Sequence, residues 1–219
     1  MTNHPIQSLK ALPKALLVKS LIFVLIVYAL YDGVYVWADS RRLMLDMADV
    51  RSGLVPILVM HIDVPLLLGS VLICLLFDRK GTLAALAIHS GRALFLMFLG
   101  GALFLEAVYI VKPSGTVAAY EIIHALVIAG ILEELIFRGL LFSWLDAAGG
   151  GIWAYLLSGL AWGAHYAIRT IVVGSTATLW AVLPVAAFGI VVGSVAAFVY
   201  KKSDSLWLVA YLHGALALL

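Results

Sequence analysis

The run VAAYEIIHALVIAGILEELIFRGLLFSWLDA, residues 117–147, decides what kind of fold this chain can adopt. It is largely apolar, and it is longer than the roughly 20 residues that a helix needs to cross a lipid bilayer. The helix-breaking sequences KPSG, residues 112–115, and GGG, residues 149–151, bound it on either side. We therefore expect one long helix from about Val117 to Ala147, with the charged motif GILEELIFRG, residues 130–139, inside it.

The composition of the whole chain indicates that this helix lies in a membrane. Hydrophobic residues make up 64% of the 219 residues, charged residues make up 12%, and the mean hydropathy is +1.12. Soluble domains are about 45–50% apolar and about 25% charged. We predict an all-α, polytopic integral membrane helical bundle, with one transmembrane domain over residues 1–219 and an active site inside the bundle. The formal net charge of +2 and the lack of a basic run argue against a nucleic-acid partner.

Apolar runs divide the rest of the chain into six more spans, which gives about seven transmembrane helices. The first span is too long for the roughly 7–15-residue core of a signal peptide, so we interpret it as an anchor. After the turn DRKG, residues 78–81, we expect a short interfacial helix from Thr82 to Arg92, and we expect a surface or re-entrant loop from Arg169 to Thr178. The six spans are residues 15–38, 54–77, 93–111, 152–168, 179–200 and 206–219.

Ionisable residues inside membrane spans are expensive, so each is a hypothesis for a functional site. Some of them lie near predicted span ends or near prolines, where a structural or interfacial role is the simpler interpretation. We give that interpretation to Asp32, His61, Asp63, Glu106, Glu121 and His124.

The charged motif of the long helix is different, because its three charges lie within six residues. Glu134 and Arg138 are four residues apart with the acid first, which is the favourable order for an ion pair on one helix face. Glu133 then remains, about 100° round the helix from Glu134. A buried carboxylate near an arginine can serve as a general base. The alternative is a packing ion pair with one acid in a wet cavity.

Two histidines on later spans strengthen the functional interpretation. His165 lies in SGLAWGAHYA, residues 158–167, where Gly159 and Gly163 keep the helix thin and allow close approach of a neighbour. His213 lies near the middle of the last span. Two histidines and two glutamates in membrane spans could either bind a metal or hold and activate a water molecule.

EELIFR, residues 133–138, resembles the EExxxR signature of the CAAX-protease and bacteriocin-processing family, the Rce1-like glutamic intramembrane proteases. In that family the signature is followed by two helices that each carry a histidine. His165 and His213 stand in this order and at suitable distances. The resemblance covers about residues 118–219.

The resemblance implies a mechanism that needs no metal and no other cofactor. Glu133 would take a proton from a water molecule that His165 holds, Glu134 and Arg138 would shape the site, and His213 would stabilise the oxyanion. The substrate would be a membrane-tethered protein or peptide that is cut near its terminus, such as a prenylated CAAX-like tail, a sorting tail or a leader peptide. The expected location is a membrane, in a prokaryote the plasma membrane.

This chain departs from the family pattern at two positions. The family has Phe four residues before the first histidine, where this chain has Ala161, and Trp162 is the nearest aromatic. The family has Asn or Asp four residues after the second histidine, where this chain has Ala217. The chain's single Asn and single Gln lie within its first seven residues, so His213 would have to act with a backbone N–H, a hydroxyl or a tyrosine.

Two other classes of function remain open on the sequence alone. Glu133, His165 and His213 could bind zinc in an intramembrane metalloprotease, although no HExxH motif is present. The chain could instead be a non-catalytic membrane scaffold, a chaperone-like subunit or a transporter, with the buried ionisable residues as a proton relay.

Overall fold

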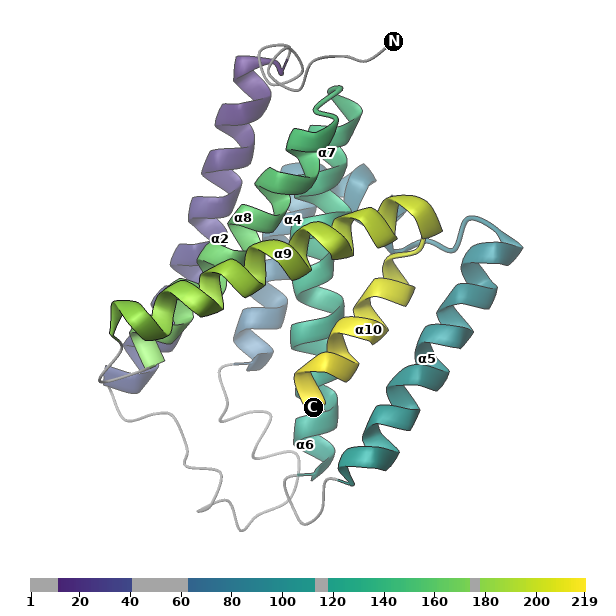
Figure 1. Ribbon diagram of the computed structural model, residues 1–219. Helices are drawn as coiled ribbons and strands as arrows, with labels where there is room; N and C mark the ends of the chain where they lie inside the picture. Colours follow the sequence, from purple (N-terminus) through teal and green to yellow (C-terminus); the bar gives the residue numbers. More distant parts are fainter. Residues whose placement is uncertain (1–11, 41–62, 113–117, 174–177) are drawn as a thin grey trace.

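The computed structural model describes residues 12–40, 63–112, 118–173 and 178–219, and within them every regular element is a helix (Figure 1). This confirms the all-α prediction for the described residues. Around a central helical segment lie α2 Lys14–Ser40, α4 Asp63–Leu86, α5 Gly91–Val111, α8 Ile152–Val173, α9 Leu179–Ser203 and α10 Leu206–Leu218.

The central segment is the long helix that the sequence predicts, and it runs without interruption from residue 118 to residue 147. Its winding was not predicted. It consists of α6 Ala118–Ile123, the π-helix η2 His124–Leu132, the π-helix η3 Leu135–Phe142 and α7 Ser143–Ala147. Glu133 and Glu134 lie between the two π-helical stretches, and wide turns of this kind often occur at functional sites.

Neighbouring helices enclose the central segment so closely that residues 132–142 are all buried. α10 packs against both η2 and α5, α4 packs against η3, and α9 runs obliquely across the bundle (Figure 1). Among the described helices, α5 and α9 are long and apolar enough, by length and composition, to cross a membrane.

The short helix expected from Thr82 to Arg92 is present over its first part, after a kink at Asp78, but its predicted end at Arg92 is wrong. α4 instead continues to Leu86 through a bend at Asp78, and α5 begins after its N-cap residue, Ser90. The reason is local, because Oδ1 of Asp78 accepts a 2.8 Å hydrogen bond from the backbone N–H of Gly81. This is the bond that an N-cap residue makes, so the helix restarts directly after the bend.

The loop expected from Arg169 to Thr178 is wrong over its first half, because α8 continues to Val173. Residues 169–173 contain no helix breaker, and the first glycine after them is Gly174. Residues 174–177 of the expected loop lie outside the described residues.

A cluster around Trp144 fixes the end of the central segment to α2 and α4. The indole ring lies 5.1 Å from the ring of Phe23, and the ammonium group of Lys19 lies 3.8 Å from its centre. The indole N–H donates a 2.8 Å hydrogen bond to Oδ2 of Asp78. The bend in α4 therefore presents one carboxylate both to its own helix and to the central segment.

The small residues of α8 allow the close helix approach that the sequence predicts. A Cβ atom on Gly163 would lie 2.6 Å from the carbonyl oxygen of Ala186, and one on Gly159 would lie 2.6 Å from that of Ile190. α9 offers glycines in return, since a Cβ on Gly189 would lie 2.7 Å from the Cα of Gly163. α8 and α9 therefore meet backbone to backbone beside Trp162 and His165 of α8.

Candidate active site

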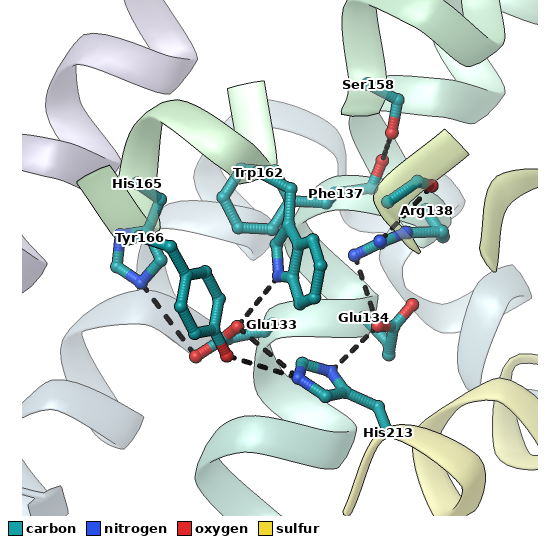
Figure 2. Close-up of polar contacts among 10 residues, drawn as sticks. Glu133, Glu134, Phe137, Arg138, Ser158, Trp162, His165, Tyr166 and His213 are labelled. Atoms are coloured by element: carbon teal, nitrogen blue, oxygen red, sulfur yellow. Dashed lines mark hydrogen bonds and ion pairs between the residues drawn. The ribbon is translucent and has the colours of Figure 1, made fainter. Parts of the chain in front are cut away.

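The two adjacent carboxylates of the central segment point to different partners. Glu133 turns toward α8, and Glu134 turns toward Arg138 and His213 (Figure 2). Both side chains are 1% exposed, so neither carboxylate has more than marginal contact with solvent. A charge held in such surroundings must find partners within the protein or at a bound molecule.

Glu133 faces side chains from α8 and α10, and Tyr166 of α8 is among them. The indole N–H of Trp162 donates a 2.9 Å hydrogen bond to Oε2 of Glu133. Nε2 of His165 lies 3.8 Å from Oε1, and Nε2 of His213 lies 3.9 Å from Oε2. A separation of 3.8 Å allows one water molecule to lie within hydrogen-bond distance of both Glu133 and His165.

Glu134 forms the ion pair with Arg138 that the spacing predicts, with 3.1 Å between Oε1 and Nη1. The same carboxylate oxygen lies 2.9 Å from Nδ1 of His213. Arg138 also donates from Nη2 to the carbonyl oxygen of Gly193 on α9, at 3.3 Å, and its guanidinium lies 4.8 Å from the centre of the Trp162 ring. The pair therefore connects the central segment to α8, α9 and α10.

All five residues that the sequence singles out lie in this one cluster. They come from the central segment, α8 and α10, and all are buried, His213 being the most exposed at 8%. Of the six other ionisable residues that the sequence singles out, those whose side chains the structure describes do not join it. Glu106 and Glu121 are exposed and His124 is half-buried. The side chains of Asp32 and Asp63, and the whole of His61, lie outside the described residues.

Two aromatic residues at the site were not predicted as site residues. Trp162, which the sequence marks only as the aromatic nearest to an expected Phe, hydrogen-bonds Glu133. Tyr166 lies with its hydroxyl 3.3 Å from Nε2 of His213. Their spacing of four residues places them on one face of α8, and that spacing next to His165 is the signal that could have identified them.

Contacts behind His165 fix the position of α8. The ring of Tyr28 on α2 stacks on the imidazole at 6.1 Å between centroids, and its hydroxyl donates to the carbonyl oxygen of Ala161. α8 is also joined to the central segment, because the hydroxyl of Ser158 donates a 2.9 Å hydrogen bond to the carbonyl oxygen of Phe137. These contacts hold His165 at a fixed position relative to Glu133.

A cavity of about 220 Å³ opens onto the cluster between α8, α9 and α10. Apolar side chains make most of its wall, and the polar ones belong to the site. A smaller cavity of about 120 Å³ adjoins Glu134 and Arg138 between α9 and α10. The larger cavity is lined by Trp162, Tyr166, Val185, Phe188, Gly189, Val192, His213, Leu216 and Ala217.

Some polar atoms of the site have no hydrogen-bond partner among the described residues. Oε1 of Glu133 and Oε2 of Glu134 are two of these buried atoms. Buried carboxylate oxygens are normally paired, so their arrangement is typical of a site that binds water or a polar ligand. Within the described part of the chain, no group of three or more His, Cys, Asp or Glu side chains has an arrangement that could hold a metal ion.

Comparison with known proteins identifies one family. Residues 115–219 match the family model described as Type II CAAX prenyl endopeptidase Rce1-like. No curated protein and no solved structure matches the chain.

Proposed function

Residues 115–219 of this chain belong to the Rce1-like family of CAAX prenyl endopeptidases, and from that premise we propose that the protein is a glutamic intramembrane endopeptidase. The family is a family of integral membrane proteases that act on membrane-associated proteins or peptides. The observation that carries the finer proposal is the convergence of His165 and His213, from two separate helices, on the buried carboxylate of Glu133.

In the proposed reaction, Glu133 is the general base. A water molecule held between Glu133 and Nε2 of His165 gives a proton to the carboxylate as its oxygen attacks the carbonyl carbon of the peptide. The carbonyl π electrons move to the oxygen and form the oxyanion. The intermediate then collapses, the C–N bond breaks, and the proton on Glu133 passes to the leaving amine.

The remaining residues position these groups. Arg138 holds Glu134 and spans to the backbone of α9, which supports a structural role for this pair beside the reacting atoms. His213 has its Nδ1 against Glu134 and lines the larger cavity, where Nε2 of the imidazolium form would donate to the substrate carbonyl oxygen. A donor fixed in that place favours the transition state because it is oriented before charge develops.

The proposed substrate is a membrane-tethered protein or peptide that is cut near its terminus, with a prenylated CAAX-like tail as the first choice. The mostly apolar lining of the cavity beside His213 suits an apolar segment or lipid group next to the scissile bond. We propose further that all seven predicted spans cross the membrane as one domain, and that this membrane is a prokaryotic plasma membrane.

The test is a cleavage assay on the full chain, purified in detergent and returned to vesicles. The probe is an internally quenched peptide that ends in a prenylated Cys-aliphatic-aliphatic-X sequence. Glu133→Gln and His165→Ala should each abolish cleavage, while the matched variant Glu121→Gln, at an exposed glutamate of α6, should retain it. Cleavage that survives in Glu133→Gln contradicts the assignment of the base.

The same assay separates the alternatives from the proposal. A metal chelator should leave cleavage unchanged, and inhibition that zinc reverses would favour the zinc enzyme with Glu133, His165 and His213 as ligands. The assay is repeated with quenched peptides that carry a sorting tail or a leader sequence. A scaffold or chaperone-like subunit would cleave none of these probe peptides, and it would keep its biological activity in Glu133→Ala.

A further inference from the structure

We propose that the hydroxyl of Tyr166 donates a hydrogen bond to the oxyanion, in the place where the family pattern has Asn and this chain has Ala217. The inference rests on the proposed function, because it assigns a second donor to the same site. It concerns this chain in particular, since the departure at Ala217 is what makes a different donor necessary.

The geometry places Tyr166 beside the group that the resemblance assigns to the oxyanion. Its hydroxyl lies 3.3 Å from Nε2 of His213, so the two polar atoms point to one place although they come from α8 and α10 (Figure 2). Both residues line the larger cavity. An oxygen atom of a substrate in that cavity could therefore be within hydrogen-bond distance of both.

Ala217 is on the same wall of that cavity. It lies four residues after His213, hence on the same face of α10, and it also lines the cavity. Its methyl group offers no hydrogen-bond donor. Among the described residues that line the cavity, the polar side chains are Trp162, Tyr166 and His213. The Trp162 N–H is already donated to Glu133, so Tyr166 is the residue that can take the place of the amide.

The hydrogen bonds of His213 add a second reason. Its Nδ1 lies 2.9 Å from Oε1 of Glu134, and a carboxylate can only accept, so a neutral ring carries its proton on Nδ1. Nε2 is then an acceptor, and it receives the Tyr166 O–H at 3.3 Å. The neutral ring therefore offers no N–H to the cavity, whereas the imidazolium ring donates from Nε2. In both forms Tyr166 has an O–H that can turn to the oxyanion, as the second donor beside an imidazolium His213 and as the first beside a neutral one.

With Tyr166 as the donor, every bond, charge and proton of the chemical step is accounted for. When water attacks, the C–O bond to the water oxygen forms, the carbonyl π electrons become the oxyanion charge, and the water proton goes to Glu133. Tyr166 shares its proton in a hydrogen bond and keeps it throughout, so no other reactant is needed. The bond strengthens as charge develops, which accelerates the chemical step rather than substrate binding.

The first test is Tyr166→Phe in the prenylated-peptide assay, with Tyr211→Phe as the matched control. Tyr211 is on α10 with its ring packed near Gly101 of α5, away from the cavity lining. Removing one oxyanion donor typically lowers kcat by roughly 10²–10³-fold. We expect a loss on that scale for Tyr166→Phe, with KM within about twofold, and no comparable loss for Tyr211→Phe. A kcat within about threefold of the wild-type value would overturn the proposal.

The second test restores the family residue. Ala217→Asn in the Tyr166→Phe background should recover at least about tenfold of the lost kcat, because the amide N–H₂ replaces the hydroxyl. In the wild-type background, Ala217→Asn should change kcat by less than about threefold, since a donor is already present. No recovery in the first background would show that Tyr166 acts only by positioning His213. A tenfold gain in the second would show that the site lacks a second donor, and it would overturn the proposal even if Tyr166→Phe did not fold.

These results also separate the failure of this inference from the failure of the proposed function. If Glu133→Gln abolishes cleavage while Tyr166→Phe retains it, the protease assignment stands and only the role of Tyr166 is wrong. If the wild-type chain cleaves none of the probe peptides, or if Glu133→Gln cleaves as the wild type does, the proposed function itself fails.

Discussion

The indole N–H of Trp162 donates a 2.9 Å hydrogen bond to Oε2 of Glu133, so the aromatic residue of α8 directly contacts the proposed base. The aromatic ring of this chain stands one position later than the family pattern has it, which turns its direction by about 100° on a helix. A phenylalanine could only pack against the site. Trp162 also orients the carboxylate.

Trp162→Phe should therefore lower kcat/KM by about tenfold or more. A hydrogen bond to a charged group contributes about 1.5–3 kcal/mol, and the variant loses it while keeping most of the aromatic packing. Trp207→Phe is the matched control. Trp207 lies near the start of α10, and its indole N–H donates to the carbonyl oxygen of Leu86 on α4. Equal rates for the two variants would contradict a role of the indole N–H in orienting Glu133.

Arg138→Met should strongly destabilise the protein. Arg138 is fully buried, and its removal leaves the buried charge of Glu134 with His213 but without its cationic arginine partner. Breaking a buried pair in this way typically costs about 3–5 kcal/mol in the free energy of unfolding. Thermal unfolding in detergent measures the change. Adding Glu134→Gln should recover part of the loss, because the unpaired charge is then removed as well.

The exposed ion pair between Lys201 and Asp146 provides the control for that prediction. Lys201→Met should change stability by no more than about 1 kcal/mol, as surface pairs usually do. If Arg138→Met costs as little as Lys201→Met, the buried pair is not a structural support of the site.

Gly163→Ala should lower both stability and cleavage. Its Cβ would lie 2.6 Å from the carbonyl oxygen of Ala186, and backbone atoms can yield only if α8 and α9 move apart. Overpacking of this kind costs about 1–3 kcal/mol, and it would displace Trp162 and His165, which lie close by on α8. The matched control is Gly101→Ala, where the new Cβ would meet the Tyr211 ring at an ordinary distance of 3.7 Å. Similar losses in both variants would argue against this account of the helix contact.

Asp78 should make stability depend on acid pH. The backbone N–H of Gly81, with the Trp144 indole and Lys19 as weaker causes, holds the pKa of Asp78 below its usual value. A carboxyl whose pKa is lowered by folding contributes stability above its unfolded pKa of about 3.9, and this is lost as pH falls through the folded value. We expect Asp78→Asn to be less stable at pH 7, because the two bonds go to different carboxylate oxygens and the amide puts an NH₂ donor in place of one of them.

The measurement for Asp78 is the difference in unfolding temperature between wild type and Asp78→Asn. That difference should keep its pH 7 value down to the unfolded pKa of about 3.9 and shrink as the pH falls below it toward the lower folded pKa. A difference that stays constant over this range would mean that the carboxylate charge does not stabilise the bend in α4.

The sequence predicts the helical elements well because long apolar runs and breakers act locally. The errors lie where side chains override them. At Asp78 one carboxylate restarts a helix at the sequence DRKG, which by its composition predicts a turn. After Ile168 the reduced hydropathy does not stop α8, because no helix breaker follows before Gly174. The π-helical winding around Glu133 and Glu134 was not predicted from the sequence, and these two stretches pack against α4 and α10.

In the candidate site too, some residues could be predicted from local sequence, whereas others depend on contacts between distant parts of the chain. Glu133, Glu134 and Arg138 could be predicted because their charges conflict with an apolar helix, and His165 and His213 because their order follows the family pattern. Tyr166 was not predicted, since a tyrosine in an apolar span is ordinary, and its position next to His165 and four residues after Trp162 is the sequence signal that marks it. Its importance depends on the 3.3 Å approach of its hydroxyl to a histidine 47 residues away in the chain.

α9 contributes to the larger cavity with Val185, Phe188, Gly189 and Val192, yet these side chains carry no charge and no proton that could be transferred. The proposed reacting groups stand on the central segment, α8 and α10, and of these elements α8 and α10 form the opposite wall of the cavity. The helix that would meet the substrate's apolar part is thus separate from the helices that would break the bond. Substitutions along α9 could therefore change which substrates bind without changing the residues proposed to hydrolyse the peptide bond.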